Sequence, residues 1–272
     1  MKKYLIALDL DGTLLYDWTT LKPSTANYLK ALQEAGHTLV IATGRPFRSS
    51  ERFYDQLGLN TPMINYNGGI ITSKHDPHFK EQTIWLEKEA ILEVFSTHKH
   101  VILNAFCEIK DDVYLLEDDP KLYDFLHLEN GARLFLGPFE KTLPGPTNGF
   151  IIIAQKDAGE HIVNHVNSHY QGVLMARSWG DHEVAILELY TPKTNKGEAL
   201  SFVAQSLGFS LADVIAFGDG INDFELLKVA GWGVAMKNGV EDLKAQADDV
   251  TPWTNKEDGV IRYLDAYLKS NK

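Results

Sequence analysis

The chain has 272 residues, of which 44% are apolar and 23% are charged, a composition typical of a globular protein with a sizeable core. At about 150 residues per domain, this length favours two domains. The formal net charge of -11 disfavours nucleic acids and anionic membranes as partners, and the single cysteine excludes an intrachain disulfide and suits a reducing cytoplasm.

The N-terminal segment opens with a run of apolar residues and then carries two carboxylates, Asp9 and Asp11, followed by Gly12 and Thr13. The apolar run predicts a buried parallel strand with the acids at its carboxyl end. Two carboxylates this close repel each other, so they bind a cation, share a proton or are both solvated. Because Asp9 breaks the run, no signal peptide is expected, and no apolar run approaches the ~18 residues that span a membrane.

Strands and helices alternate through residue 72. Ser24 or Thr25 is expected to cap a helix that ends at Gly36. A second helix is expected over residues 48–57, and strands over residues 38–42, 63–65 and 70–72, the last two joined by a turn at residues 67–69. This alternation predicts a parallel sheet with right-handed crossovers.

The pattern changes near residue 83. A helix is expected over residues 86–97 and another over 162–169, with a loop at 137–149. The short strand-like runs of this part are residues 101–103, 113–116, 133–136, 149–154, 172–176 and 183–189. The middle of the chain therefore predicts a small α+β domain on an antiparallel sheet.

The α/β alternation resumes at Lys196. Helices are expected over residues 197–207, 224–230, 240–247 and 258–269, and strands over 214–217 and 233–236. The fold class is therefore α/β, a doubly wound parallel (Rossmann-like) core sheet with an inserted α+β domain. We expect the core domain to comprise residues 1–82 and 188–272, and the inserted domain residues 83–187.

Polar side chains gather where core strands are expected to end. Asp9 and Asp11, Thr43, Lys196, and Asp219 with Asp223 are each expected at the carboxyl end of a separate core strand, and those ends meet at one edge of a parallel sheet. Four carboxylates are the hard oxygen ligands that Mg²⁺ prefers. No group of histidines and cysteines has zinc spacing, and the ten histidines are scattered. His98 and His100, at a helix end, are expected to be solvent-exposed or to interact with the helix dipole.

Each of these residues also has a structural interpretation. Lys196 is either a solvent-facing lysine or the partner of an anion, and the second is favoured because a cation is unfavourable at a helix N-terminus. Asp223 is a potential helix cap as well as a ligand. Arg45 is either an ion-pair partner or a substrate contact, and Asn67 is either a substrate contact or part of a turn.

The order and spacing of these motifs resemble the haloacid dehalogenase superfamily, and the tail and the position of the insert resemble its Cof-type subfamily. Asp9-Leu10-Asp11-Gly12-Thr13 resembles the first motif of the superfamily, Thr43-Gly44-Arg45 the second, Lys196-Gly197 the third, and Gly218-Asp219 through Asp223 the fourth. The resemblance covers essentially the whole chain. It implies that the inserted domain is a cap over the site.

The resemblance implies a role for each residue. Asp9 is the expected nucleophile and Asp11 the expected general acid and base. Mg²⁺ is expected on the Asp9 side chain, the Asp11 backbone carbonyl, Asp219 and Asp223. The expected phosphate-binding groups are Thr43, Gly44 and Lys196; Asn222 is expected to fix Lys196 or the acidic loop; and the candidate substrate contacts are Arg45, Asn67 and, in a loop of the cap, Arg177, Trp179 and His182.

The expected function is a cytoplasmic, Mg²⁺-dependent phosphatase of small phosphorylated metabolites, such as sugar phosphates or phosphorylated cofactors, acting through an aspartyl-phosphate. No nucleic-acid or membrane partner is expected. Three alternatives stay open: a phosphotransferase or mutase that uses the same intermediate, a metabolite-binding protein without turnover, and, as the least favoured, a dehalogenase. The physiological substrate and the oligomeric state are not predicted.

Overall fold

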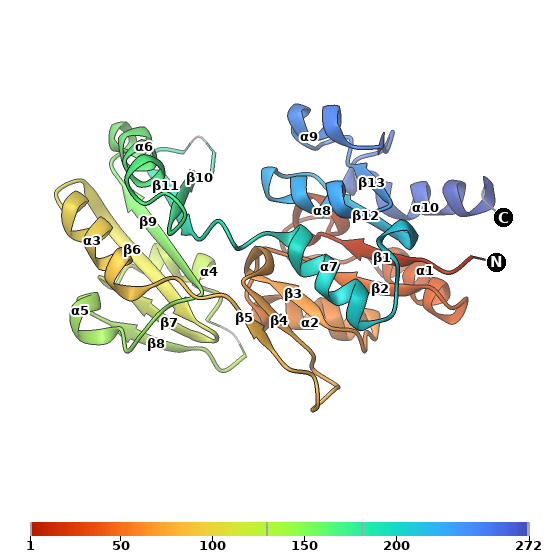
Figure 1. The fold of residues 1–272 in the computed structure, drawn as a ribbon, viewed down its shortest axis with the longest axis horizontal. Coiled ribbons are helices and arrows are strands. Elements are labelled where there is room, and N and C mark those ends of the chain that lie inside the picture. The colour runs from red at the N-terminus through yellow and green to blue at the C-terminus, as the bar shows by residue number, and fades with distance from the viewer. Residues whose placement is uncertain (1, 129, 181, 271–272) are drawn as a thin grey trace. The chain divides into compact units, whose positions relative to one another are not determined.

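A computed structural model describes residues 2–128, 130–180 and 182–270. The chain forms two compact units (Figure 1). Unit 1 comprises the chain through Arg45, residues Ser50–Gln82 and the chain from Asn195 onward. Unit 2 comprises Pro46–Ser49 and Thr83–Thr194. The predicted boundary between residues 187 and 188 falls inside a strand that pairs within unit 2, so that boundary is wrong by seven residues (194 − 187).

Unit 1 is built on a five-stranded parallel sheet of order β14-β13-β12-β1-β2. β1 lies in the interior of the sheet, and all four of its residues are fully buried. The strands are β1 (Leu5–Leu8), β2 (Thr38–Ile41), β12 (Val214–Gly218), β13 (Trp232–Ala235) and β14 (Asp249–Val250). A small sheet follows β2, with β3 (Met63–Asn65) antiparallel to β4 (Ile70–Thr72), and β4 beside β5 (Gln82–Thr83).

Helices cover both faces of the parallel sheet, as the doubly wound prediction requires. Leu5 and Ala7 of β1 pack in one core cluster with residues of α7, α8 and α9. On the other face, Phe217 of β12 packs edge-on against Tyr263 of α10, and α10 contacts α1. The helices are α1 (Pro23–Glu34), α2 (Phe47–Leu57), α7 (Lys196–Ser206), α8 (Phe224–Val229), α9 (Glu241–Gln246) and α10 (Gly259–Ser270).

Unit 2 is built on a six-stranded sheet of order β10-β11-β9-β6-β7-β8. Neighbouring strands are antiparallel, as expected, except that β8 runs parallel to β7. The strands are β6 (Ile102–Ile109), β7 (Asp112–Leu115), β8 (Arg133–Leu136), β9 (Gly149–Ala154), β10 (Met175–Ser178) and β11 (Ala185–Tyr190). Helices α3 (Lys88–His98), α5 (Phe139–Thr142) and α6 (Gly159–His169) share a core cluster with the sheet, and α4 (Tyr123–Leu126) joins a second cluster.

Four sequence predictions about these elements are wrong. The first helix begins at Pro23 with Lys22 at the N-cap, so neither Ser24 nor Thr25 caps it. Residues 137–149 are not all loop, because the fully buried Phe139 anchors α5. Arg177 lies in β10 instead of a loop. For His98 the solvent-exposed alternative is wrong, because the side chain packs against α6 and is 3% exposed although it ends α3.

The remaining short turns are η1 (Leu10–Leu14), directly after Asp9, and several 3-10 turns; the N–H of Leu15 closes η1 by donating to the carbonyl of Leu10 at 2.9 Å. The 3-10 turns are Tyr66–Gly68, Pro120–Leu122, Lys156–Ala158, Leu211–Asp213, Ile221–Asp223 and Asn255–Glu257. Among the described residues, no helix combines the length and the hydropathy that a bilayer crossing needs.

Candidate active site

Asp9 lies at the carboxyl end of the central strand β1. Its backbone N–H donates to the carbonyl of Phe217 on β12 at 3.2 Å, which continues the sheet pairing by one residue. The chain then leaves the sheet in η1, where Gly12 has a φ of 76°. Asp9 is 4% exposed, so its carboxylate is held in the interior at the point where β1 ends.

Lys196 is fully buried and supplies the positive charge of the site. Its Nζ donates to Asp9 Oδ1 at 2.6 Å and to Asp223 Oδ1 at 2.7 Å. The prediction that it follows a core strand is wrong, because the strand before it, β11, belongs to unit 2. Lys196 is instead placed by the first turn of α7, which Asn195 caps by accepting from the N–H of Glu198 at 2.8 Å.

Asp219 and Asp223 lie in the loop after β12. Asp223 is 1% exposed, and its Oδ2 accepts from the backbone N–H of Asp219 at 2.9 Å and of Gly220 at 3.0 Å. Asp223 therefore closes its own loop while its other oxygen meets Lys196. Gly218 makes this possible, since a Cβ there would lie 2.4 Å from the Cβ of Asp223.

Thr13 is a site residue to which the sequence analysis gave no role. Its Oγ1 donates to Asp219 Oδ1 at 2.7 Å and so joins η1 to the loop after β12. Asn238 adds a second tie, because its side-chain amide donates to the carbonyl of Gly12 at 2.7 Å. The position of Thr13, two residues after Asp11, could have indicated its role. The position of Asn238 could not, because Asn238 is 226 residues from Gly12 in the sequence.

The carboxylates of Asp9, Asp219 and Asp223 form a group whose potential ligand oxygens lie within 4.8 Å of one another. Burial raises the pKa of Asp9 well above its ordinary value, despite the opposing charge of Lys196, and burial with the charge of Asp223 raises the pKa of Asp219 to about 7. Burial lowers the pKa of Lys196, but the larger combined effect of the Asp223 and Asp9 carboxylates holds that pKa above its ordinary value. Three acids facing one lysine, with oxygen donors only, fit a small hard cation such as Mg²⁺.

Asp11 is not part of that group, because its side chain pairs with Arg45. Arg45 Nε donates to Asp11 Oδ2 at 2.7 Å and Arg45 Nη2 to Asp11 Oδ1 at 2.5 Å, the two-point geometry that a guanidinium favours. The same Nη2 donates to the carbonyl of Trp18 at 2.6 Å, and the guanidinium carbon lies 5.6 Å from the ring centre of Phe53. The ion-pair interpretation of Arg45 is therefore the one that the structure displays.

Thr43 and Gly44 follow β2 and lie close to two asparagines. The carbonyl of Thr43 accepts from the N–H of Asn67 at 3.0 Å, and its Oγ1 accepts from the N–H of Arg45 at 3.2 Å. Asn67 Oδ1 in turn accepts from Asn222 Nδ2 at 2.8 Å. Asn222 was expected to fix Lys196 or the acidic loop; its side chain contacts Asn67 and so connects the loop after β12 to Asn67.

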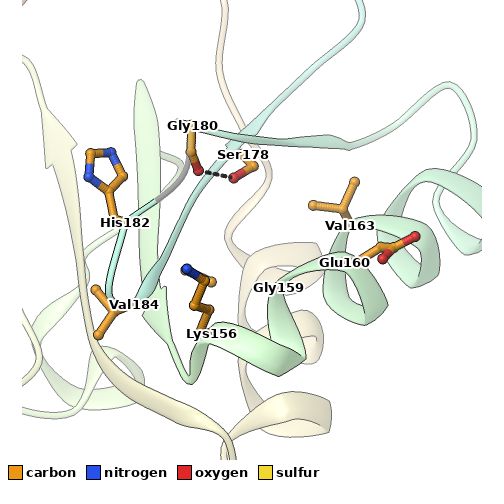
Figure 2. Close-up of a pocket in the computed structure, with 9 residues that line it drawn as sticks. Lys156, Gly159, Glu160, Val163, Ser178, Gly180, His182 and Val184 are labelled. Atoms are coloured by element: carbon orange, nitrogen blue, oxygen red, sulfur yellow. Dashed lines mark hydrogen bonds between the residues drawn. The ribbon is translucent and has the colours of Figure 1, made fainter.

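The candidate residues of unit 2 lie beside Glu188 and beside a cavity. Arg177 and Trp179 both donate to Oε2 of Glu188 on β11, with Trp179 Nε1 at 2.9 Å and Arg177 Nε at 2.8 Å. His182 instead lines a cavity of about 280 Å³ together with Lys156 (Figure 2). The Nε2 of His182 also lies 2.7 Å from the carbonyl oxygen of Trp179, so hydrogen bonds connect all three candidates within unit 2.

Comparison with known proteins gives matches along nearly the whole chain. A model of the haloacid dehalogenase-like hydrolase family matches residues 6–264. The 5-amino-6-(5-phospho-D-ribitylamino)uracil phosphatase YitU of Bacillus subtilis is 33% identical, over 98% of each chain. The pyridoxal phosphate phosphatase YbhA of Escherichia coli is 31% identical, over 98% of this chain and all of the relative. A solved haloacid dehalogenase-like hydrolase from Bacteroides thetaiotaomicron superposes with a TM-score of 0.80 at 27% identity, over 98% of this chain and 100% of that one.

Proposed function

This chain belongs to the haloacid dehalogenase-like hydrolases and is a Cof-type phosphoric monoester hydrolase, and we propose that it cleaves small phosphorylated metabolites through an aspartyl-phosphate on Asp9. The observation that carries the proposal is the buried lysine of the site. Lys196 holds Asp9 Oδ1 at 2.6 Å and Asp223 Oδ1 at 2.7 Å without any exposure to solvent. A buried carboxylate oriented by a lysine, at the end of a central strand, suits a nucleophile that attacks an anionic group.

In the first half-reaction, an Asp9 oxygen attacks phosphorus as the bond from phosphorus to the alcohol oxygen breaks. Asp11, in its protonated form, gives its proton to that leaving oxygen. In the second, Asp11 accepts a proton from a water molecule as the water oxygen attacks phosphorus. The bond from phosphorus to Asp9 then breaks, inorganic phosphate leaves, and both carboxylates return to their starting state.

Charge on the phosphoryl oxygens requires donors and cations. Lys196 is the fixed cation of the site, and Thr43 Oγ1 and the backbone near Gly44 are the proposed donors to phosphoryl oxygens. Mg²⁺ would be held by Asp9, Asp219 and Asp223 with the Asp11 carbonyl, and it would neutralise the charge that keeps an anionic nucleophile away from an anionic phosphate. Arg45 holds both oxygens of the Asp11 carboxylate, so one of those oxygens would have to leave Arg45 to carry the proton of the first half-reaction.

The proposed substrates are phosphate monoesters of small metabolites. Two relatives that align with nearly the whole chain are named for such esters, one a phosphoribitylamino-uracil and the other pyridoxal phosphate. The proposed cytoplasmic location rests on cysteine usage, since Cys107 is a buried free thiol and the sequence has no other cysteine.

Phosphate release tests the proposal directly. The purified protein is incubated with a panel of phosphorylated metabolites that includes the two named esters, with Mg²⁺ and with EDTA, and Asp9→Asn is run beside it. Mg²⁺-dependent release that disappears in the variant supports the proposal. Conversion of substrate without inorganic phosphate would indicate a phosphotransferase, and release that persists in Asp9→Asn or in EDTA would contradict the proposed chemistry.

A further inference from the structure

Four histidines of unit 2 gather where α3 meets α6. His161, His165 and His169 recur every four residues along α6, so they share one face of that helix. His98 ends α3 and contacts this face. The three positions on α6 repeat at helical spacing, but their partner lies more than sixty residues earlier, so the sequence showed scattered histidines.

The central contact of the cluster is between two ring nitrogens. His98 Nε2 and His165 Nδ1 are 2.8 Å apart, and one of them must donate a hydrogen to the other. The His161 ring lies 5.8 Å from the His98 ring, centre to centre, at an interplanar angle of 78°. The His169 ring stacks on His165 with its centre 5.3 Å away.

The surroundings of His98 favour the neutral form of its imidazole. His98 is 3% exposed, and its burial, followed by the neighbouring His165, His161 and His100, lowers its pKa. A neutral imidazole has one nitrogen with a free electron pair, which is the form that binds metal ions. The cluster therefore presents nitrogen ligands from two helices and differs in ligand chemistry from the all-oxygen acidic group of unit 1.

We propose that His98 Nε2, His165 Nδ1 and the ring of His161 form a binding site for a zinc-class divalent ion, for which imidazole is a preferred ligand. Two nitrogens bound tetrahedrally to one zinc ion at 2.0–2.1 Å are about 3.4 Å apart. The pair at 2.8 Å must therefore open by about 0.6 Å (3.4 − 2.8). The imidazole that now donates must also change its tautomer, so that its hydrogen is on the other ring nitrogen. This change leaves the net charge of the ring unaltered.

The third ligand requires a side-chain rotation. Among the described side chains, the acidic group alone already has three ligand atoms within 4.8 Å of one another. His161 is exposed, so it is able to turn toward the pair without unpacking the core. Pairs of histidines four residues apart on a helix bind zinc in other proteins, and His161 and His165 have that spacing. A bound ion would join α3 to α6 and stabilise unit 2 by linkage.

The test is a Zn²⁺ titration by competition with a chromophoric chelator. Asp219→Asn serves as the background, because it weakens metal binding at the acidic group. In that background we expect one equivalent of Zn²⁺ to bind at pH 7.5. We expect His165→Asn to weaken binding by more than about tenfold, which is the loss that even an outer-shell change causes. Binding should also weaken from pH 7.5 to 5.5, because protons compete for the nitrogens.

His78→Asn is the matched control, because His78 is exposed in unit 1 and should leave the titration unchanged. Long-range ¹H–¹⁵N spectra of histidine-labelled Asp219→Asn identify the ligands independently of any folding defect in a variant. They should show zinc-induced shifts of the His98 Nε2 and His165 Nδ1 signals. Unchanged signals at these two nitrogens, or equal Zn²⁺ affinity with and without His165, would overturn the proposal.

Discussion

Asp9 is the side chain on which the proposed chemistry depends. Its structural contacts can be kept in a variant that lacks the nucleophilic carboxylate. Its oxygen accepts from Lys196, and its backbone continues the pairing of β1 with β12. An asparagine has nearly the same shape and keeps an oxygen that can accept from Lys196. We therefore expect Asp9→Asn to lose turnover by several orders of magnitude while its circular dichroism spectrum stays that of the wild type. Substantial activity in the pure variant would rule out Asp9 as the nucleophile.

Lys196 has a structural role that can be measured apart from catalysis. Lys196→Met leaves Asp9 and Asp223 buried without their cation, and removing one partner of a buried ion pair costs about 3–5 kcal/mol. We expect this loss in urea unfolding without Mg²⁺, together with loss of turnover. Lys228→Met on α8 is the control, since Lys228 is exposed and should change stability by less than about 0.5 kcal/mol. Equal stability of the two variants would contradict the buried pair.

The sequence indicated which residues belong to the candidate site better than it indicated which residues they contact. A lysine in the first turn of a helix implied an anion, and the structure places two carboxylates there. The Asn222–Asn67 bond joins positions 155 residues apart, and no spacing rule indicates such a contact. For Arg45, the sequence left the ion pair and the substrate contact open, because both use the same guanidinium.

At the scale of elements, the turn after β1 allows two loops to meet. A Cβ on Gly12 would lie 2.2 Å from Asp219 Oδ2, and the φ of 76° is one that side chains rarely adopt. We expect Gly12→Ala to lower stability by more than the ~1–3 kcal/mol that such a backbone costs, and to raise the Mg²⁺ concentration needed for activity. The measurements are urea unfolding and a Mg²⁺ titration of phosphate release.

Gly208→Ala is the matched control for that prediction. Its φ of 75° is nearly the same, but nothing lies within 4 Å of its built Cβ. Gly208→Ala should therefore lose only the stability that the strained backbone conformation costs, and its activation by Mg²⁺ should match that of the wild type. If the two variants responded alike to Mg²⁺, the close approach of Gly12 to Asp219 would have no bearing on the site.

The contact between α3 and α6 predicts a pH dependence of stability. The pKa of His98 is lowered by burial below its ordinary 6.5, so the unfolded chain takes up a proton there at a higher pH than the folded chain does. Stability is therefore fully present above pH 6.5 and is lost as the pH falls toward the lower folded pKa. The groups that face His98 are His161 and His165 from α6 and His100 after α3, and their proximity also lowers the pKa of His98.

Thermal unfolding in metal-free buffer between pH 7.5 and 5 measures this dependence. We expect the melting temperature to fall with pH, and to fall less steeply in His98→Asn than in the wild type. His37, whose pKa is also lowered by burial, contributes with the same sign in both proteins, so the difference between them isolates His98. Parallel pH profiles would show that the cluster does not control stability.

The elements themselves followed closely from the sequence, and the errors have physical causes. Continuous apolar runs and helical spacing identified the helices of ten or more residues and the parallel strands of unit 1 except β14, which has only two residues. The four-residue helices α4 and α5 were missed, because one turn has too few residues for a period. The parallel pairing of β8 with β7 and the extent of β11 depend on contacts between distant strands, which local patterns do not contain.

At the scale of the whole molecule, the site is assembled from separate parts of the chain. Asp9 comes from the first strand, Asp219 and Asp223 from the loop after β12, and Lys196 from the residues where the chain re-enters unit 1 after unit 2. The long insertion therefore leaves the chemistry of the site in one unit. The residues that follow β1 and β12 meet in one site despite the insertion, because these two strands are neighbours in the sheet.

The measurement that most directly tests the account is chemical trapping of the phosphorylated carboxylate. Asp11→Asn, which lacks the proposed base for the hydrolytic water, is mixed with substrate and Mg²⁺, quenched, treated with hydroxylamine and mapped by mass spectrometry. We expect a hydroxamate on Asp9 that appears only with substrate and is absent from Asp9→Asn/Asp11→Asn. Phosphate release by Asp11→Asn without modification of Asp9, or modification of another carboxylate, would contradict it.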